Sequence, residues 1–151
     1  MASDIIFRRA TAEDVTAIVA LLADDVLGQA REGAPSNPAY AEAFAAIDAS
    51  PDQLLAVATA AGEVVATLQL SFLPGLARMG AWRGQIEAVR VAATHRRSGL
   101  GAKLLRWAID QCRARGCALV QLTTDKTRPD AHRFYEELGF VASHVGYKLA
   151  L

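Results

Sequence analysis

The sequence predicts an α/β fold with a mixed sheet, built as one domain over residues 1–151. Three observations predict it: apolar runs that form a hairpin around Gly62, helix-periodic segments between strand-like ones, and a β-α-β crossover over residues 86–123. Of the 151 residues, 52% are hydrophobic and 21% charged. That composition can bury one core and argues against disorder.

The first half of the chain opens with a strand and two helices. We expect, in order, a strand at 5–8, a helix at 15–22, a loop at 28–38, a helix at 39–47 and hairpin strands at 54–59 and 64–72. Val15, Ile18, Val19 and Leu22 keep a helical period. The loop is rich in Gly, Pro, Ser and Asn, which favour turns.

The second half contains the crossover. We expect a long loop at 73–84, a strand at 86–91, a helix at 99–115, a strand at 118–123, a helix at 131–138 and one or two strands within 140–151. Strict alternation in the strand at 86–91 places Ile86, Ala88 and Arg90 on one face and Glu87, Val89 and Val91 on the other. The helix at 99–115 is amphipathic and ends at Gly116.

Charge and composition exclude some functions. The 16 basic residues balance the 16 acidic ones, which argues against a general nucleic-acid binder. No apolar run has membrane-spanning length and the N-terminus does not resemble a signal peptide, so we expect a cytoplasmic protein with no membrane partner. The cysteines and histidines lack metal-ligand spacing, and we expect no metal.

A phosphate site is predicted where the strand at 86–91 leads into the next helix. Gly99 and Gly101 allow close approach of a ligand to the backbone, and the helix start offers free amides and the positive end of the dipole. Arg96 and Arg97 add positive charge. A Walker loop would need Lys-Ser or Lys-Thr after the last glycine, and a dinucleotide fingerprint needs a third glycine; both are missing.

Two segments resemble the GNAT acetyltransferase superfamily. Arg96-x-x-Gly99-x-Gly101 matches its pyrophosphate motif, Gln/Arg-x-x-Gly-x-Gly/Ala. Residues 131–140, AHRFYEELGF, resemble its A-x-x-F-Y-x-x-x-G-F motif, and this region with Ser143-His144 resembles the aminoalkylphosphonate acetyltransferase branch. The resemblance implies a mainly antiparallel mixed sheet, splayed at a central β-α-β cofactor site and flanked by about four helices.

The resemblance also implies acetyl-CoA as co-substrate. The strand backbone would hold its pantetheine arm and the loop amides its pyrophosphate, which gives a cofactor set of Val89, Arg90, Val91, Arg96, Arg97, Ser98, Gly99, Leu100, Gly101 and Ala102. Many members have an Asn three residues before the alanine of the second motif, where this chain has Arg128. A cation there could still reach a CoA phosphate.

Acyl transfer to an amine needs a base for the ammonium proton and an acid for the departing thiolate. Tyr135 is the candidate acid, since a phenol of pKa about 10 holds its proton at neutral pH; alternatively it only packs beside Phe134. Glu87 is the candidate base, directly or through water, in an otherwise apolar strand where partial burial would raise its pKa. The alternative is an edge charge or an ion pair with Arg83.

Three functions remain open at this point. The first is transfer of acetyl to a primary amine of a small molecule, the second acetylation of a peptide or protein amine, and the third acyl-CoA sensing without catalysis. The acceptor pocket would be built by the loops at 28–38 and 73–84, whose sequences do not identify the amine. A homodimer through the late strands fits such folds.

Overall fold

A computed structural model describes residues 3–25 and 27–151. Its five strands form one sheet in the order β1-β2-β3-β4-β5. They are β1 (Ile5–Arg9), β2 (Gln53–Ala60), β3 (Glu63–Leu73), β4 (Arg83–Val91) and β5 (Leu119–Leu122). Neighbours pair antiparallel except β4 and β5, which are parallel. The predicted mixed, mainly antiparallel sheet and the hairpin turning at Gly62 are confirmed.

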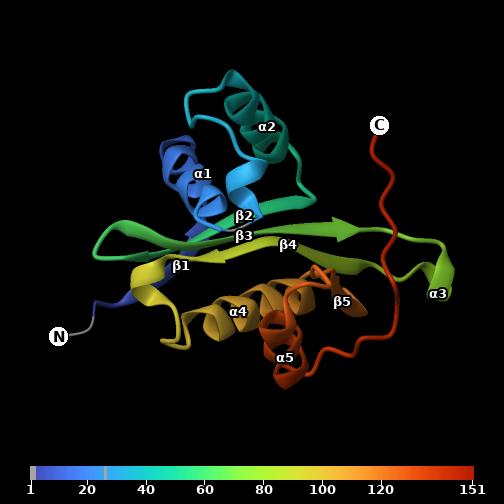
Figure 1. Ribbon diagram of the computed structural model, residues 1–151. Helices are drawn as coiled ribbons and strands as arrows, with labels where there is room; N and C mark the ends of the chain where they lie inside the picture. The colour runs from blue at the N-terminus through green and yellow to red at the C-terminus, as the bar shows by residue number, and fades with distance from the viewer. Residues whose placement is uncertain (1–2, 26) are drawn as a thin grey trace.

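Helices cover both faces of the sheet (Figure 1). One face carries α1 (Val15–Ala23) and α2 (Pro38–Ala49), and the other carries α4 (Leu100–Ala114) and α5 (Pro129–Glu137). Short 3-10 turns, η1 (Ala12–Asp14), η2 (Gly28–Ala30) and η3 (Ala93–His95), link these elements. Among the described residues no helix has the length and apolar character needed to cross a membrane.

The main core lies between the sheet and α4. The apolar stripe of α4 is fully buried against β3 and β4, through Leu104, Leu105, Ala108 and Cys112. Packing is close at Gly84, where an added Cβ would lie 2.3 Å from the Sγ of Cys112. Cys112 and the half-buried Cys117 are free thiols. This packing fixes α4 across the sheet and therefore fixes where its N-terminus meets the end of β4.

The predicted loop at 73–84 is confirmed with slightly shorter bounds, since Leu73 ends β3 and Arg83 begins β4. It contains α3 (Ala77–Gly80), a turn with Arg78 and Met79 in left-handed conformation. One expectation about the sheet was wrong. The strands predicted within 140–151 are absent. That segment is exposed from Val141 on and pairs with no strand of the described residues, although Gly146 lies beside Thr123, just beyond β5.

Candidate active site

The predicted phosphate loop connects β4 to α4. After η3 the backbone turns through Arg97, with φ of 61°, and Gly99, with φ of 82°, before α4 begins at Leu100. Residues 96–99 are exposed, while Leu100 anchors the helix start in the core. The amides of the first helical turn have no intrahelical acceptor. The loop thus presents donors and a dipole to solvent, which fits a bound pyrophosphate.

Of the two loop glycines, only Gly99 has a backbone conformation that requires glycine. Its left-handed φ disfavours any L side chain. Gly101 is helical, and a Cβ there would make ordinary contacts with Phe134 at 3.4 Å and Val91 at 3.7 Å. The structure therefore explains why the family motif accepts Gly or Ala at the second position.

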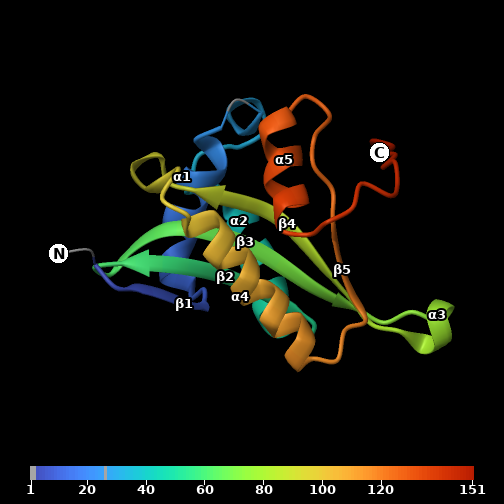
Figure 2. The same cartoon turned by 90° about the horizontal axis from the view of Figure 1, so that it is seen from below.

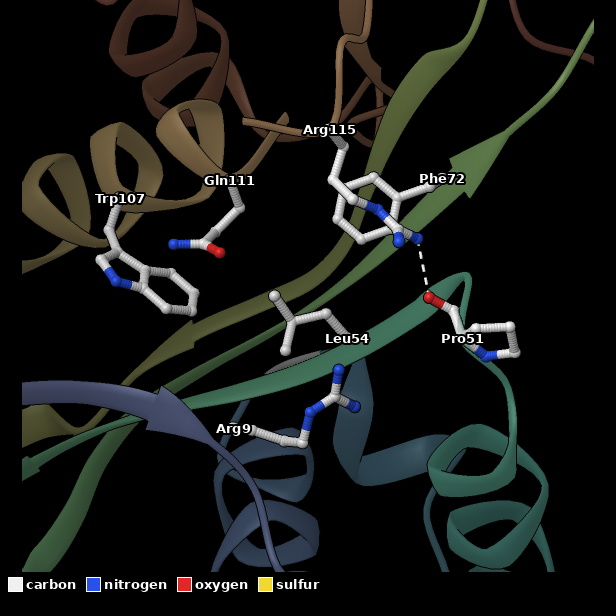
Figure 3. Close-up of a pocket in the computed structure, with 7 residues that line it drawn as sticks. All are labelled: Arg9, Pro51, Leu54, Phe72, Trp107, Gln111 and Arg115. Carbon is white, nitrogen blue, oxygen red and sulfur yellow. Dashed lines mark hydrogen bonds between the residues drawn. The ribbon is translucent and has the colours of Figure 1, made fainter. Parts of the chain in front are cut away.

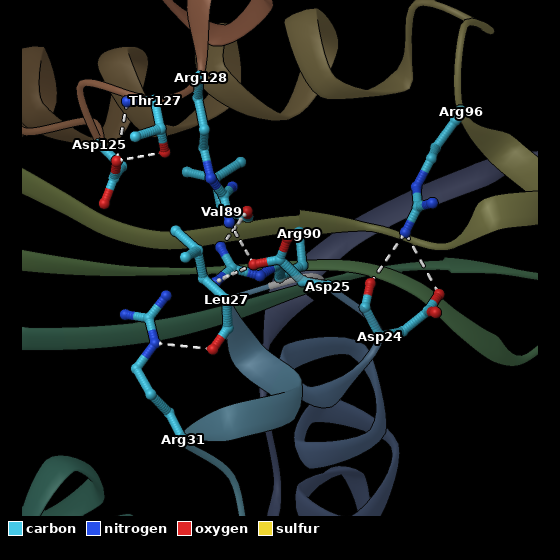
Figure 4. A network of polar contacts seen from close by, with 10 residues as sticks. All are labelled: Asp24, Asp25, Leu27, Arg31, Val89, Arg90, Arg96, Asp125, Thr127 and Arg128. Carbon is cyan, nitrogen blue, oxygen red and sulfur yellow. Dashed lines mark hydrogen bonds and ion pairs between the residues drawn. The ribbon is translucent and has the colours of Figure 1, made fainter.

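The side chain of Arg96 ties the loop to the end of α1 (Figure 4). Its guanidinium lies 3.2 Å from Asp24 Oδ2 and 3.1 Å from the Asp24 carbonyl, and its Nε donates to the Val91 carbonyl at 3.1 Å. Both partners of this ion pair are about half exposed, so the pair itself stabilises little.

The edge of β4 opens next to this loop. Pairing of β4 with β5 stops at Ile86 and Leu122, whereas β4 continues to Val91. Figure 2 shows α5 lying beside this diverging end of the sheet. The carbonyls of Val89 and Val91 accept bonds from the arginine side chains of Arg90, at 2.9 Å, and Arg96. Because β4 pairs with no strand of the described residues on this side beyond Ile86, an extended ligand can be placed along residues 87–91 as an added strand.

A β-bulge changes which side chains share a face of β4. Glu87 pairs with Gln69, and Arg90 pairs with Thr67, so residues 88 and 89 together oppose the single residue 68. Ala88 has a left-handed φ of 54°. Because Thr67 and Gln69 share a face of β3, Arg90 and Glu87 also share one.

The predicted alternation of β4 was therefore wrong beyond Glu87. Val89 and Val91 pack with Ile86 against the core on the α4 side. Arg90 is turned instead toward the side of α1, where it meets Asp25. Glu87 thus lies on the face opposite Val89 and Val91.

Tyr135 lies on α5 and packs against the α4-side core. Its ring makes edge contacts with Phe134, at a centroid distance of 5.2 Å, and with Phe140 at 5.9 Å. Burial raises the pKa of its phenol, and this outweighs the lowering by the nearby positive charges of Arg90 and Arg128. The phenol is therefore protonated at neutral pH, as a proton donor must be.

Glu87 is exposed, so the partial burial expected for it is missing. Its Oε1 accepts a hydrogen bond from Gln85 at 2.7 Å. Gln85 also accepts from Gln121 at 2.9 Å, and Gln121 accepts from Arg83 at 3.3 Å. Glu87 therefore ends a polar row across β4 and β5 and is open to water.

An ion-pair cluster around Asp25 was not predicted. Asp25 bridges Arg128, at the start of α5, and Arg90, whose nitrogen lies 3.3 Å from the carboxylate (Figure 4). Burial raises the pKa of Asp25, but the hydrogen bond from Arg128 and both positive charges hold it below its ordinary value. The available signal was two acidic residues, Asp24 and Asp25, at a helix C-terminus, where the macrodipole disfavours them without cationic partners.

A hollow of about 300 Å³ lies elsewhere, at the C-terminal end of α4. Figure 3 shows Arg115 over the ring of Phe72, with 4.1 Å between guanidinium and ring centroid. Arg115 also donates to the Pro51 carbonyl at 2.7 Å and to Asp52 at 3.0 Å. The chain's own arginine occupies this hollow, so we assign it a packing role.

The open strand edge, the phosphate-type loop and the protonated phenol define a class of enzyme, the acyltransferases that move an acetyl group to nitrogen. The Acetyltransferase (GNAT) family model matches residues 15–140. The chain belongs to the GNAT family and is an N-acetyltransferase by that membership. The resemblance read from Arg96–Gly101 and residues 131–140 is confirmed.

Two relatives are named N-acetyltransferases, and a third similar protein is a solved structure of another name. Aminoalkylphosphonate N-acetyltransferase of Salmonella typhimurium is 32% identical over 144 residues, 95% of this chain and 90% of that protein. Glucosamine 6-phosphate N-acetyltransferase 1 of Oryza sativa subsp. japonica is 31% identical over 130 residues, 79% of this chain and 74% of that one. The crystal structure of a transcriptional regulator from Bacillus halodurans C-125 has a TM-score of 0.95 and 46% identity, covering 98% of this chain and all of that one.

Proposed function

We propose that this enzyme transfers the acetyl group of acetyl-CoA to the primary amine of a small molecule. The observation that carries the proposal is the free edge of β4 beyond Ile86, which runs directly into the exposed amides at the start of α4. An extended amide-containing chain ending in a pyrophosphate fits both parts at once. Val89, Arg90 and Val91 hold the extended part, and Arg96, Arg97, Ser98, Gly99, Leu100, Gly101 and Ala102 hold the phosphates.

The reaction joins the amine nitrogen to the acetyl carbon and breaks the carbon–sulfur bond. Acetyl-CoA supplies an activated carbonyl carbon. Tyr135 donates its proton to the departing sulfur, and the exposed Glu87 accepts the amine proton directly or through water. The backbone amide of Val89 is the candidate donor to the carbonyl oxygen. An amine that arrives as ammonium loses two protons in all: one replaces the proton that Tyr135 gives to the sulfur, and the other is released to solvent.

The two loop glycines provide a matched test of cofactor binding. Gly99→Ala forces a side chain into a left-handed conformation, which costs about 1–2 kcal/mol, so we expect the dissociation constant for CoA to rise about 5- to 30-fold. Gly101→Ala adds only ordinary contacts and is expected to leave it within about 2-fold. Titration calorimetry with CoA measures both. Equal affinities of the two variants would place the cofactor away from this loop.

The acceptor class is supported by the relatives' names. Aminoalkylphosphonate and glucosamine 6-phosphate each join an amine to a phosphorus oxyanion. The common chemistry is a small amine with a doubly charged group, and we propose that this enzyme takes an acceptor of that kind.

A panel of amines tests the function. We expect release of free thiol from acetyl-CoA with small primary amines and little release with peptides that carry a free N-terminus or lysine. Preferred turnover of the peptides would favour acetylation of protein amines. A silent panel, with CoA binding measured by calorimetry, would overturn the enzymatic function in favour of a sensor.

We also propose a homodimer held by the C-terminal segment 141–151. Its side chains Val145, Tyr147, Leu149 and Leu151 alternate along an extended chain, the pattern of a strand, and are 63–118% exposed. β5 ends the sheet, so its outer edge pairs with no strand of the described chain. One molecule thus carries both a strand without a sheet and a sheet edge without a strand, and two copies related by a two-fold axis satisfy both.

A further inference from the structure

The cluster around Asp25 contains more positive than negative charge. Arg90 comes from β4, Arg128 from the start of α5 and Arg31 from the end of η2 (Figure 4). Two carboxylates, Asp25 and Asp125, face these three guanidinium groups. Burial lowers the pKa of Arg90, and the charges of Arg128 and Arg31 lower it further, because three cations share this small space.

Many donors of these arginines have no partner among the described residues. Arg90 gives one nitrogen to the Val89 carbonyl and one to Asp25, and its buried Nε has no acceptor among the described residues. Arg31 uses only Nε, toward the Leu27 carbonyl at 3.1 Å. Each guanidinium carries five N–H groups, so the cluster can receive a further acceptor-rich anion.

The arginine cluster also lies on a face of β4 from which its ligand can reach the open edge of the strand. The bulge at Ala88 turns Arg90 away from Val89 and Val91, whose side chains face α4. Arg90 and Arg128 nevertheless lie close enough to Tyr135 to lower the pKa of its phenol. A ligand held by these arginines would therefore reach the open edge of β4 from the side of α1, opposite the core that supports Tyr135.

We propose that Arg31, Arg90 and Arg128 form the binding site for the anionic group of the acceptor, a phosphonate or phosphate monoester. This rests on the proposed acetyl transfer and assigns Arg128 to the acceptor rather than to a CoA phosphate. A phosphorus oxyanion offers three acceptor oxygens to three guanidinium groups, whereas a carboxylate offers two. Asp25 holds Arg90 and Arg128 in place as a fixed counter-ion.

The test compares amines that differ only in the anion. We expect the wild-type KM for 2-aminoethylphosphonate and O-phosphoethanolamine to lie at least about 10-fold below that for ethylamine, with β-alanine between them. Arg128→Gln and Arg90→Gln should each raise the KM of the two phosphorus compounds about 10-fold or more relative to the KM of ethylamine, which carries no anion. Arg113→Gln, which removes an exposed arginine paired with Asp110 on α4, is the matched control.

Binding without turnover gives a second readout. Methylphosphonate, which has no amine, should bind the wild type in calorimetry and compete with the phosphorus-containing amine, and Arg128→Gln should abolish both effects. If the Arg90 or Arg128 variants do not fold, Arg31→Gln alters an exposed side chain and should still raise the KM of the phosphorus compounds selectively. A fall in activity that is equal for ethylamine and the phosphonate would show a structural role and overturn the site.

The outcomes distinguish failure of the arginine site from failure of the proposed acetyl transfer. If no amine is acetylated by the wild type, the acetyl transfer itself fails. If amines are acetylated with equal KM values whether or not they carry an oxyanion, the proposed acetyl transfer is supported and the proposed arginine site is wrong. A preference for phosphonate over phosphate, or the reverse, would identify which of the two sources of the oxyanion the enzyme uses.

Discussion

Tyr135→Phe is expected to lower kcat for acetyl transfer by about 100-fold or more, because general acid catalysis contributes roughly 10²- to 10⁴-fold. The phenylalanine ring keeps the edge contacts with Phe134 and Phe140, so the fold should be preserved. KM for acetyl-CoA should change little, since the hydroxyl acts on the leaving sulfur and not on binding. Steady-state measurement of thiol release gives both constants.

The control for this variant is Tyr147→Phe, which removes a hydroxyl but keeps the aromatic ring in the proposed dimer segment 141–151, and it should leave kcat unchanged. The pH dependence of kcat provides a second test of Tyr135. Burial raises the pKa of Tyr135 above its ordinary value of 10.0, so the loss of activity through ionisation of this phenol should begin at a higher pH than for an exposed tyrosine. An unchanged kcat in Tyr135→Phe would remove Tyr135 from the chemistry.

Charge placed in the C-terminal segment is expected to separate the two copies. The wild type should elute with about twice the 16.1 kDa mass of one chain, and Val145→Asp with Leu149→Asp should give the monomer mass. In the proposed dimer the segment pairs with the β5 edge of the other copy, so an aspartate there would be buried without a partner, which costs several kcal/mol. Size-exclusion chromatography with light scattering measures the mass.

Met79→Asp is the matched control for the segment. Met79 is also apolar and fully exposed, but it lies in α3, outside residues 141–151. This variant should remain dimeric. A wild-type mass of one chain at micromolar concentration, or a dimer that survives the paired substitution, would contradict the proposed homodimer.

Periodicity predicted the parts of the fold that are stabilised within one or two neighbouring elements. The helices of residues 100–114 and 129–137 and the hairpin at Gly62 follow from spacing, turn residues and buried stripes. The phosphate loop was equally local, since its glycines, arginines and helix start lie within a few residues. These features could be read because each depends on short-range sequence.

Features that depend on distant partners could not be predicted. Asp25 and Arg128 are 103 residues apart in sequence, and neither has a local pattern that names the other. The bulge at Ala88 arises from pairing with β3, so alternation along β4 alone gave the wrong faces. The strands expected within 140–151 are absent, because a strand needs a neighbour and the described chain provides none there.

The extra residue at Ala88 divides β4 into two segments with separate functions. Residues up to Glu87 follow one register and hold β5, while residues from Val89 on follow another and leave their edge free. If residue 88 were kept but the bulge were lost, residue 88 alone would oppose residue 68 and every later side chain would turn over: the Arg90 guanidinium would enter the apolar layer beneath α4, and Val91 would face the acidic end of α1. The bulge therefore sets the face of every later side chain of β4, on which both proposed ligand sites depend.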